Sequence, residues 1–177
     1  MRIIAGERRG ATIAAPRGLA TRPTGDRVRE AAYNLIGPVD GASVLDLFAG
    51  SGAMGLEALS RGASSCVFVE SDRTACRVIQ DNLSKLRLTG ALVVCKDCFQ
   101  ALREERTAGR RYDLVLIDPP YDAWPDLQPR LAEELPAAIA PGGLLVVETA
   151  AKLEPQLSLT PVVSRRYGSA RITLFAG

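Results

Sequence analysis

Short apolar segments alternate with helical segments through most of this chain, and this alternation constrains the fold more than any other feature. The apolar segments cover residues 43–48, 65–70, 91–95, 112–117 and 143–148. The helical segments between them cover roughly residues 52–61, 72–87, 98–107 and 126–140. Such a βαβα pattern predicts a parallel sheet with helices on both faces. Pro136 predicts that the last helix is kinked or double.

The start of the chain departs from this pattern and predicts a hairpin. Residues 2–5 and 11–14 are brief strand-like runs on either side of a turn at residues 6–10. A two-stranded hairpin is barely stable alone, so we expect it to dock on the body of the protein or on a partner. Residues 1–20 are therefore expected to form a small N-terminal β-hairpin extension.

Residues 21–177 are expected to form one main domain. Its first helix should cover about residues 24–37. At its other end, the runs at 162–167 and 170–175 flank Gly168-Ser169, which is typical of an antiparallel hairpin. The whole chain is thus expected to be an α/β protein with a mostly parallel seven-stranded sheet and a C-terminal antiparallel hairpin.

The composition excludes several kinds of chemistry. At 177 residues the chain suits one domain, and it has no histidine, so an imidazole base or ligand is excluded. Cys95 and Cys98 have C-x-x-C spacing, but Cys66 and Cys76 form no second pair suited to a zinc site, so free thiols and no metal are expected. No apolar run approaches the ~20 residues of a membrane span, and no signal-type segment opens the chain. We therefore expect a cytoplasmic protein.

Basic residues are concentrated at the start of the chain. Residues 1–30 hold seven arginines and three acids, a net charge of +4, whereas the whole chain carries only +2. A guanidinium group can engage two phosphate oxygens at once, so this cluster favours a phosphate-rich partner. A GC-rich genome also enriches arginine and alanine, but it does not explain the clustering.

Polar residues follow the predicted parallel strands, at the edge of the sheet where open α/β folds bind ligands. Asp46 precedes a glycine-rich turn, residues 50–55, whose G-x-G-x-x-G spacing also fits a nicotinamide-binding fold. A carboxylate at Asp46, however, suits a ligand with an amine and would repel a pyrophosphate. Glu70 can accept hydrogen bonds from both hydroxyls of a ribose, as dinucleotide and S-adenosylmethionine sites both require. Asp97 either takes an adenine amino group or caps the helix that begins at Cys98.

The fourth strand ends in Asp118-Pro119-Pro120-Tyr121, the most specific signal in the chain. The prolines fix the backbone and direct the Asp118 carboxylate and the Pro119 carbonyl into one pocket. An exocyclic purine amine is a poor nucleophile, because its lone pair is delocalised into the ring. Two acceptors that hold its hydrogens favour a pyramidal nitrogen whose lone pair can attack, and Tyr121 can stack on the flipped base. The alternative is an ordinary Pro-Pro loop capped by an aspartate.

Further segments show a family pattern: 22–31 (RPTGDRVREA), 46–52 (DLFAGSG), 55–63 (GLEALSRGA), Val69-Glu70 with Asn82, and Arg166-Tyr167-Gly168. With the Asp-Pro-Pro-Tyr motif, they resemble the amino-methyltransferases of the class I S-adenosylmethionine-dependent fold, which is Rossmann-like. More closely, the chain is similar to the RsmD family of bacterial 16S rRNA guanine-N2 methyltransferases. The likeness runs from about residue 1 to the end of the chain.

This resemblance implies that residues 21–177 are a methyltransferase domain that uses S-adenosyl-L-methionine. Asp46 and the Gly50–Gly52 turn would hold its methionine end, Glu70 its ribose, and Asp97 with Cys98 its adenine. The implied cofactor-binding residues are Arg22, Pro23, Thr24, Asp46, Phe48, Ala49, Gly50, Ser51, Gly52, Glu70, Ser71, Asp97 and Cys98. The implied catalytic residues, which would hold the target guanine, are Asp118, Pro119, Pro120 and Tyr121.

The RNA-binding surface is expected at the N-terminal hairpin, with a second patch near the C-terminal hairpin. Its arginines would position phosphates, and Tyr167 would stack on RNA. The expected RNA-binding residues are Arg2, Arg8, Arg9, Arg17, Arg27, Arg165, Arg166 and Tyr167, assisted by Arg22 and Arg29. The expected partner is 16S rRNA in an assembled or assembling 30S particle, and the enzyme is expected to be a monomer.

Three other functions fit parts of the sequence. A DNA adenine-N6 methyltransferase would use a similar tetrapeptide, but no gap between the strands is long enough for the target-recognition region that such enzymes usually carry. A nicotinamide-dependent oxidoreductase would leave Asp118 and Tyr121 without a role. A catalytically silent RNA-binding module would not need the intact set of acceptors.

Overall fold

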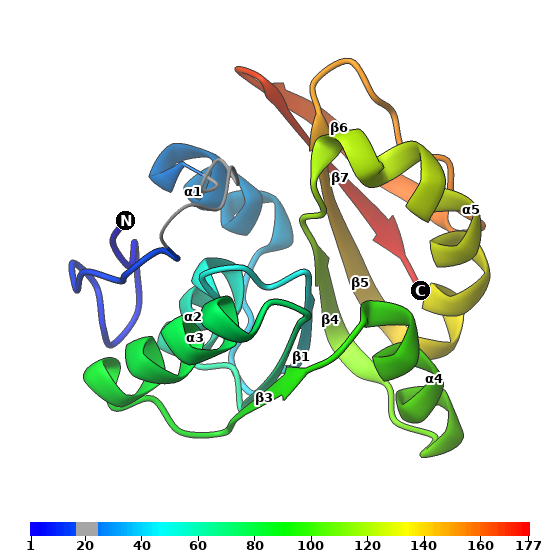
Figure 1. Cartoon of the computed structure of the whole chain (residues 1–177). Coiled ribbons are helices and arrows are strands. Elements are labelled where there is room, and N and C mark those ends of the chain that lie inside the picture. The colour runs from blue at the N-terminus through cyan, green and yellow to red at the C-terminus, as the bar shows by residue number, and fades with distance from the viewer. Residues whose placement is uncertain (17–24) are drawn as a thin grey trace.

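The computed structural model describes residues 1–16 and 25–177, in which a seven-stranded sheet lies between two layers of helices (Figure 1). The elements are α1 (Asp26–Ile36), β1 (Ser43–Leu47), α2 (Ala53–Ser60), β2 (Ser65–Glu70), α3 (Arg73–Leu86), β3 (Ala91–Cys95), α4 (Cys98–Thr107), β4 (Tyr112–Ile117), η1 (Tyr121–Ala123), α5 (Trp124–Glu134), η2 (Leu135–Ala138), β5 (Ile139–Ala150), β6 (Thr160–Tyr167) and β7 (Ala170–Ala176). The predicted alternation of strands and helices is confirmed.

The sheet has the strand order β3-β2-β1-β4-β5-β7-β6. Strands β1 to β5 run parallel, whereas β7 pairs antiparallel with both β5 and β6. The order reverses at β1 and β4, because the chain moves outward from β1 through β2 to β3 and then returns to the other side of β1. Open α/β sheets bind ligands at such a reversal. The predicted mostly parallel sheet with an antiparallel C-terminal hairpin is confirmed.

Each face of the sheet has its own hydrophobic core and its own helices. Side chains alternate along β1, so Val44 packs into one core while Leu45 and Leu47 pack into the other. Helices α1, α2 and α3 cover the Val44 face, and α4 and α5 cover the opposite face (Figure 1). Apolar side chains on both faces of one strand are what a covered parallel sheet requires.

The last helical stretch is double, as Pro136 predicts. Helix α5 ends at Glu134 and a 3-10 helix, η2, contains Pro136. The expectation that helix continues to residue 140 is wrong, because β5 already begins at Ile139, which pairs with Tyr112 of β4. An irregularity in the β4–β5 register follows Tyr112 and absorbs the early start of the strand.

The N-terminal hairpin is present but short. Its two arms form one antiparallel bridge between Arg2 and Thr12, with backbone hydrogen bonds on either side of it, including one from the N–H of Ile3 to the carbonyl of Ala11 at 2.9 Å. The turn lies directly against α2: Gly6 has a φ of +80°, and a Cβ there would lie 1.7 Å from the carbonyl oxygen of Ser60. Only glycine therefore fits at this contact.

A buried carboxylate fastens the hairpin to the helices. Glu57 of α2 accepts hydrogen bonds from the backbone N–H groups of Ile4 at 2.8 Å and Ala5 at 3.0 Å. Arg61 donates to the same carboxylate at 2.8 Å. The Nε of Arg29, in α1, lies 3.5 Å from the Glu57 carboxylate, and the guanidinium of Arg29 also donates to the backbone carbonyl of Arg2 in the hairpin. The hairpin, α1 and α2 thus meet at one buried ion pair.

Within residues 1–16 and 25–177, no helix is both long enough and apolar enough to cross a bilayer.

Candidate active site

Asp46 lies in β1 on the face covered by α1 and α2, and it is only 3% exposed. Its Oδ2 accepts a hydrogen bond from the N–H of Gly55, in the first turn of α2, at 2.9 Å. Burial raises the pKa of Asp46 from 3.8 to about 7, against the opposing effect of the Gly55 bond and with a further contribution from the charge of Glu70. Such a carboxylate is stabilised by a bound cation, for example the ammonium group of a ligand.

The turn after β1 has a backbone shape that few residues adopt. Phe48 has a φ of 59° and Gly52 a φ of 76°, both in the left-handed region. Gly52 is the N-cap of α2, and a Cβ there would lie 3.2 Å from the side chain of Ile79. A left-handed residue other than glycine, such as Phe48, stores backbone strain, which concentrates at functional sites. The turn brings backbone N–H groups, without bulky side chains, to the point where the strand order reverses.

Glu70, at the end of β2, fixes this turn. Its Oε2 accepts a hydrogen bond from the N–H of Gly50 at 2.8 Å, and its Oε1 accepts one from the N–H of Asp72 at 2.8 Å. The hydroxyl of Ser71 lies 3.5 Å from Oε1. Because each carboxylate oxygen has two lone pairs, Glu70 retains the acceptor capacity that binding of a ribose diol requires.

Asp97 is the N-cap of α4, as one of the two sequence interpretations holds. Its Oδ1 accepts hydrogen bonds from the N–H groups of Phe99 at 3.0 Å and Gln100 at 3.1 Å. The binding of an adenine amino group at Asp97 stays a prediction. Cys98 is buried in the first turn of the same helix, and burial raises its pKa to about 12, so it is a neutral thiol.

Asn82 of α3 connects the N-terminal hairpin to the glycine-rich turn. Its amide donates to the carbonyls of Ala14 at 3.0 Å and Ser51 at 3.2 Å, and its carbonyl accepts from the N–H of Ala14 at 2.8 Å. Three hydrogen bonds from one buried side chain therefore join segments far apart in the sequence. The family pattern marked Asn82, but the residues alone gave it no role.

A small cavity at the ends of β4 and β5 gathers the groups expected to hold the target base. It is lined by Asp46, Met54, Leu116, Ile117, Asp118, Val146, Glu148 and Ile172. Asp118 follows β4 directly, and the hydroxyl of Tyr121 donates a hydrogen bond to Oε1 of Glu148 at 2.8 Å. The Asp118–Tyr121 segment therefore wraps one corner of the cavity, with Pro119 buried and Pro120 exposed within it.

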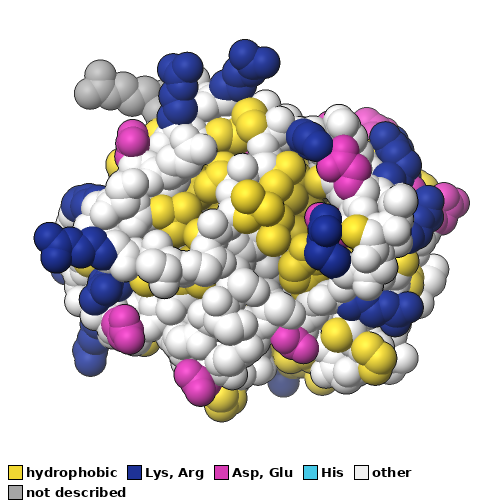
Figure 2. All heavy atoms as spheres, turned by 90° about the horizontal axis from the view of Figure 1, so that it is seen from below, with side chains coloured by type: hydrophobic (Ala, Val, Ile, Leu, Met, Phe, Trp, Pro, Cys, Tyr) yellow, Lys and Arg dark blue, Asp and Glu magenta, His cyan; other side chains and the backbone are white. Residues whose placement is uncertain are grey.

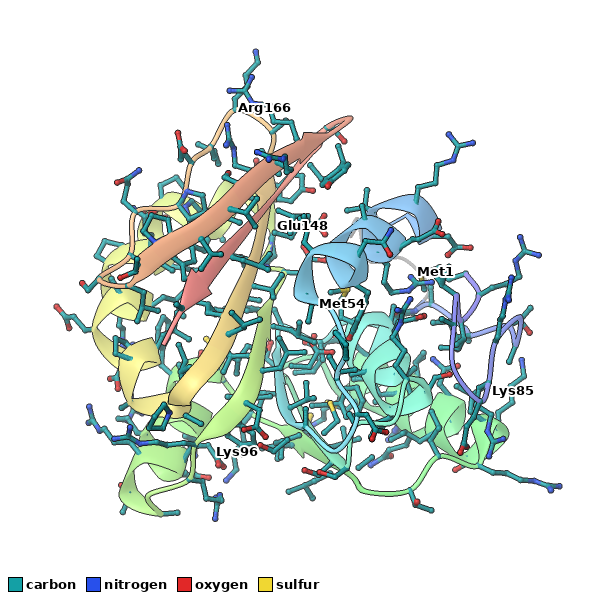
Figure 3. The ribbon with its side chains drawn as sticks, turned by 180° about the vertical axis from the view of Figure 1, so that it is seen from behind. Met1, Met54, Lys85, Lys96, Glu148 and Arg166 are labelled. Atoms are coloured by element: carbon teal, nitrogen blue, oxygen red, sulfur yellow. The ribbon has the colours of Figure 1, made fainter. Side chains whose placement is uncertain are left out.

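Glu148 is the charged residue of this cavity that the sequence analysis missed. Leu116 pairs with Val146 across β4 and β5, so the same register two residues further places Asp118 beside Glu148 on one face of the sheet. Figure 3 places Glu148 and Met54 on the side of the sheet that faces α1. The signal for Glu148 was present, because Glu148 ends the apolar segment 143–148 as Glu70 ends the segment 65–70.

The arginines near the N-terminus have different environments. Arg2, Arg9 and Arg27 are exposed. Arg8 is half-buried, and its Nε donates to the carbonyl of Leu86, at the end of α3, at 2.6 Å. Arg29 is fully buried, so the expectation that it contacts RNA is wrong. Four residues expected at the cofactor or at RNA lie outside the described residues: Arg17, Arg22, Pro23 and Thr24.

The second expected RNA patch lies at the end of β6. Arg165 and Arg166 are exposed there and Tyr167 is half-buried. Figure 3 shows Arg166 at the outer end of the β6–β7 hairpin, directed away from the body. On the face drawn in Figure 2, hydrophobic side chains gather at the centre, and the basic side chains described there stand mainly at the periphery.

Comparison with known families and proteins gives one consistent match. The family model described as Conserved hypothetical protein 95 matches residues 1–176. YlbH of Bacillus subtilis is 44% identical over 123 residues, which cover 68% of this chain and 67% of YlbH. The ribosomal RNA small subunit methyltransferase D of Escherichia coli K12 is 41% identical over 122 residues, covering 68% of this chain and 60% of that enzyme. The matched part is thus less than two thirds of the length of the E. coli enzyme.

Solved structures agree over nearly the whole chain. The structure of the Escherichia coli protein yhhF superposes with a TM-score of 0.86 at 30% identity, covering 99% of this chain and 97% of that protein. An RNA methyltransferase from Salinibacter ruber, solved with S-adenosyl-L-homocysteine, superposes with a TM-score of 0.65 at 18% identity. At that identity the second likeness concerns the fold alone.

Proposed function

The chain belongs to the RsmD family, Conserved hypothetical protein 95, and from this premise we propose that it is an rRNA methyltransferase. More specifically, it transfers a methyl group from S-adenosyl-L-methionine to the exocyclic N2 amine of a guanine in 16S rRNA. The name of the E. coli relative supports rRNA of the small subunit as the substrate. The guanine N2 position rests on the chemistry of the Asp118–Tyr121 segment.

The residues at the ends of β1 and β2 fit this cofactor. Asp46 is a buried carboxylate with a pKa raised by burial to about 7, so a nearby ammonium group favours its charged form. Glu70 is held by two backbone N–H groups and retains acceptor capacity for a ribose diol. Asp46 would therefore hold the amine of the methionine end and Glu70 the ribose hydroxyls. When bound, the cofactor supplies an electrophilic methyl group on a positively charged sulfur.

The residues after β4 act on the other reactant. The Asp118 carboxylate and the Pro119 carbonyl accept hydrogen bonds from the two hydrogens of the guanine amine. This favours a pyramidal nitrogen, whose lone pair would form the new N–CH₃ bond as the bond from methyl to sulfur breaks. The nitrogen would then pass one proton to the Asp118 carboxylate that holds it. Tyr121 lies beside Asp118 to support the flipped base. No step needs an imidazole, in agreement with a chain that has no histidine.

The observation that carries this proposal is the shared cavity. Asp46, from the cofactor side, and Asp118, from the target side, line the same small cavity at the ends of neighbouring strands β1 and β4. Methyl transfer needs the two reactants to meet with their reacting atoms about 3–3.5 Å apart. An ammonium acceptor and an amine acceptor that line one cavity support this arrangement.

The test is methyl transfer from radiolabelled S-adenosyl-L-methionine to small-subunit particles, naked 16S rRNA and duplex DNA, followed by nucleoside analysis. Label in N2-methylguanosine of rRNA is the expected result, with the particles as the better substrate. Label in N6-methyladenine of DNA would overturn the substrate and the target base. Cofactor binding without any transfer would instead indicate a catalytically silent binding module.

A further inference from the structure

The carboxylate of Glu148 is a buried acidic group that the proposed transfer does not use. Glu148 is 7% exposed and lines the cavity beside Asp118. The hydroxyl of Tyr121 donates to its Oε1 at 2.8 Å. The cavity therefore holds a second carboxylate beside Asp118, at the end of the site where the target base would bind.

Metal binding does not account for this group of acids. Asp46, Asp118 and Glu148 line one cavity, yet in the part of the chain that the structure describes no three acidic or cysteine side chains are placed to hold a metal ion. Asp46 is already accounted for by the cofactor amine and by the N–H of Gly55. Glu148 instead lies opposite Asp118 across β4 and β5. Asp118 comes two residues after Leu116, and Glu148 comes two residues after Val146, with which Leu116 pairs.

The edge of guanine carries the donors that such a pair of carboxylates would accept. Its N1–H lies next to its N2 amine, so the two groups present adjacent donors in one plane. Adenine has an acceptor at N1, and a carboxylate facing that atom would repel it. Enzymes that act on flipped bases read this edge by hydrogen bonds. A carboxylate beside the acceptor of the reactive amine therefore distinguishes guanine from bases whose N1 is an acceptor.

We propose that Glu148 is a specificity-determining residue that accepts the N1–H of the target guanine while Asp118 accepts from the N2 amine. The hydroxyl of Tyr121, in the segment after β4, orients the Glu148 carboxylate, and β5 fixes the position of the Glu148 backbone. This inference rests on the proposed guanine N2 methylation and adds the means by which the base is selected. It also explains why an acidic residue follows the apolar run 144–147 of β5.

The experiment compares two bases at the methylated position. Small-subunit particles are reconstituted with 16S rRNA in which that guanosine is either retained or replaced, by ligation, with 2,6-diaminopurine riboside. The analogue keeps the N2 amine but has an acceptor at N1. Wild-type enzyme should prefer guanine by about 10-fold or more in kcat/KM, because one buried hydrogen bond is exchanged for two opposed acceptors.

Glu148→Gln is the decisive variant. It should lower kcat/KM on guanine by about 10- to 100-fold and bring the preference over the analogue close to one, because the amide can donate to the N1 of diaminopurine. Glu133→Gln, at an exposed position of α5, is the matched control and should keep the wild-type preference. Cofactor affinity should be unchanged in both variants. Comparing both bases in both proteins isolates the contribution of Glu148.

Several results would overturn the inference. A purely structural role for Glu148 would lower activity on both bases by the same factor and leave the preference unchanged. If Glu148→Gln does not fold, Tyr121→Phe carries the test: loss of the orienting hydroxyl should reduce the preference by roughly 3-fold or more, and an unchanged preference would count against the proposal. Failure of the proposed function would look different, because wild-type enzyme would then form no N2-methylguanosine.

Discussion

At the scale of single residues, Asp46 shows how the fold prepares a side chain for a ligand. Burial raises its pKa to about 7, and the N–H of Gly55 partly offsets the shift. The group therefore changes its charge near neutral pH in the free protein. A carboxylate in this state gains most from a bound ammonium group, because the cation stabilises its charged form.

The raised pKa of Asp46 predicts that cofactor binding depends on pH. The affinity for S-adenosyl-L-methionine should rise with pH as Asp46 loses its proton, and should level off above about pH 7. Asp46→Asn should bind weakly and without this dependence, because the amide carries no charge. Isothermal titration calorimetry from pH 5.5 to 8.5 checks both. A wild-type affinity that is flat across this range would contradict the role given to Asp46.

The same shift has a consequence for stability. The folded-state pKa lies above the unfolded value of 3.8, so the folded protein holds its proton more strongly between pH 3.8 and about pH 7. The contribution of Asp46 to stability therefore falls as pH rises through this window. Asp46→Asn should accordingly raise Tm at pH 8 without cofactor, but not near pH 4. A lower Tm at pH 8 would show that the charge stabilises the free protein.

At the scale of elements, the N-terminal hairpin depends on one buried ion pair. Glu57 accepts from Ile4 and Ala5 of the hairpin, and Arg29 lies against it. Glu57→Gln should lower the free energy of unfolding by about 3 kcal/mol, since removing one member of a buried pair leaves the other charge poorly compensated. Urea denaturation measures this loss.

Hydrogen exchange can show which part of the protein is destabilised by Glu57→Gln. Hydrogen exchange at the amides of Ile4 and Ala5 should accelerate in Glu57→Gln beyond the general change, because their acceptor is altered. Glu104→Gln is the control. Glu104 lies on α4 and forms an exposed ion pair with Lys96, so this variant should change the free energy of unfolding by less than about 1 kcal/mol. Equal stability of the two variants would mean that the ion pair does not hold the hairpin.

The hairpin also offers a test of RNA binding at one exposed residue. Arg9→Ala should weaken rRNA binding and lower the salt slope of log K by roughly one, the value for one lost phosphate contact. Arg8 is less suitable, because it also donates to the carbonyl of Leu86. Arg103→Ala on the exposed side of α4 is the control. An unchanged slope for Arg9→Ala would show that the hairpin serves the fold only.

The elements were largely predictable because strands and helices differ in the period of their apolar residues. Two local errors have physical reasons. Strand β5 starts at Ile139, ahead of a Pro-Gly-Gly sequence, because pairing with Tyr112 outweighs the local turn signal. Arg29 counts as surface by residue type, yet it is buried because the hairpin covers α1 and Glu57 supplies its partner.

At the scale of the whole molecule, the site depends on which strands are neighbours. The sequence places Asp46, Glu70 and Asp118 at strand ends, and the parallel sheet brings these ends to one edge. Glu148 escaped prediction, because its closeness to Asp118 depends on the register between β4 and β5. Register is a property of the folded sheet, so a sequence pattern reports strand ends but not which side chains meet across them.

The central claim is that Asp118 acts on the target amine and not on the cofactor. The most direct measurement compares Asp118→Ala with Asp122→Ala, an exposed aspartate four residues further along the chain, for both cofactor binding and methyl transfer to small-subunit particles. Asp118→Ala should bind S-adenosyl-L-methionine as the wild type does and lose transfer by at least about 100-fold, the usual scale for removing one preorganised contact to the reacting group. Asp122→Ala should retain both. Turnover by Asp118→Ala close to that of the wild type would contradict this account.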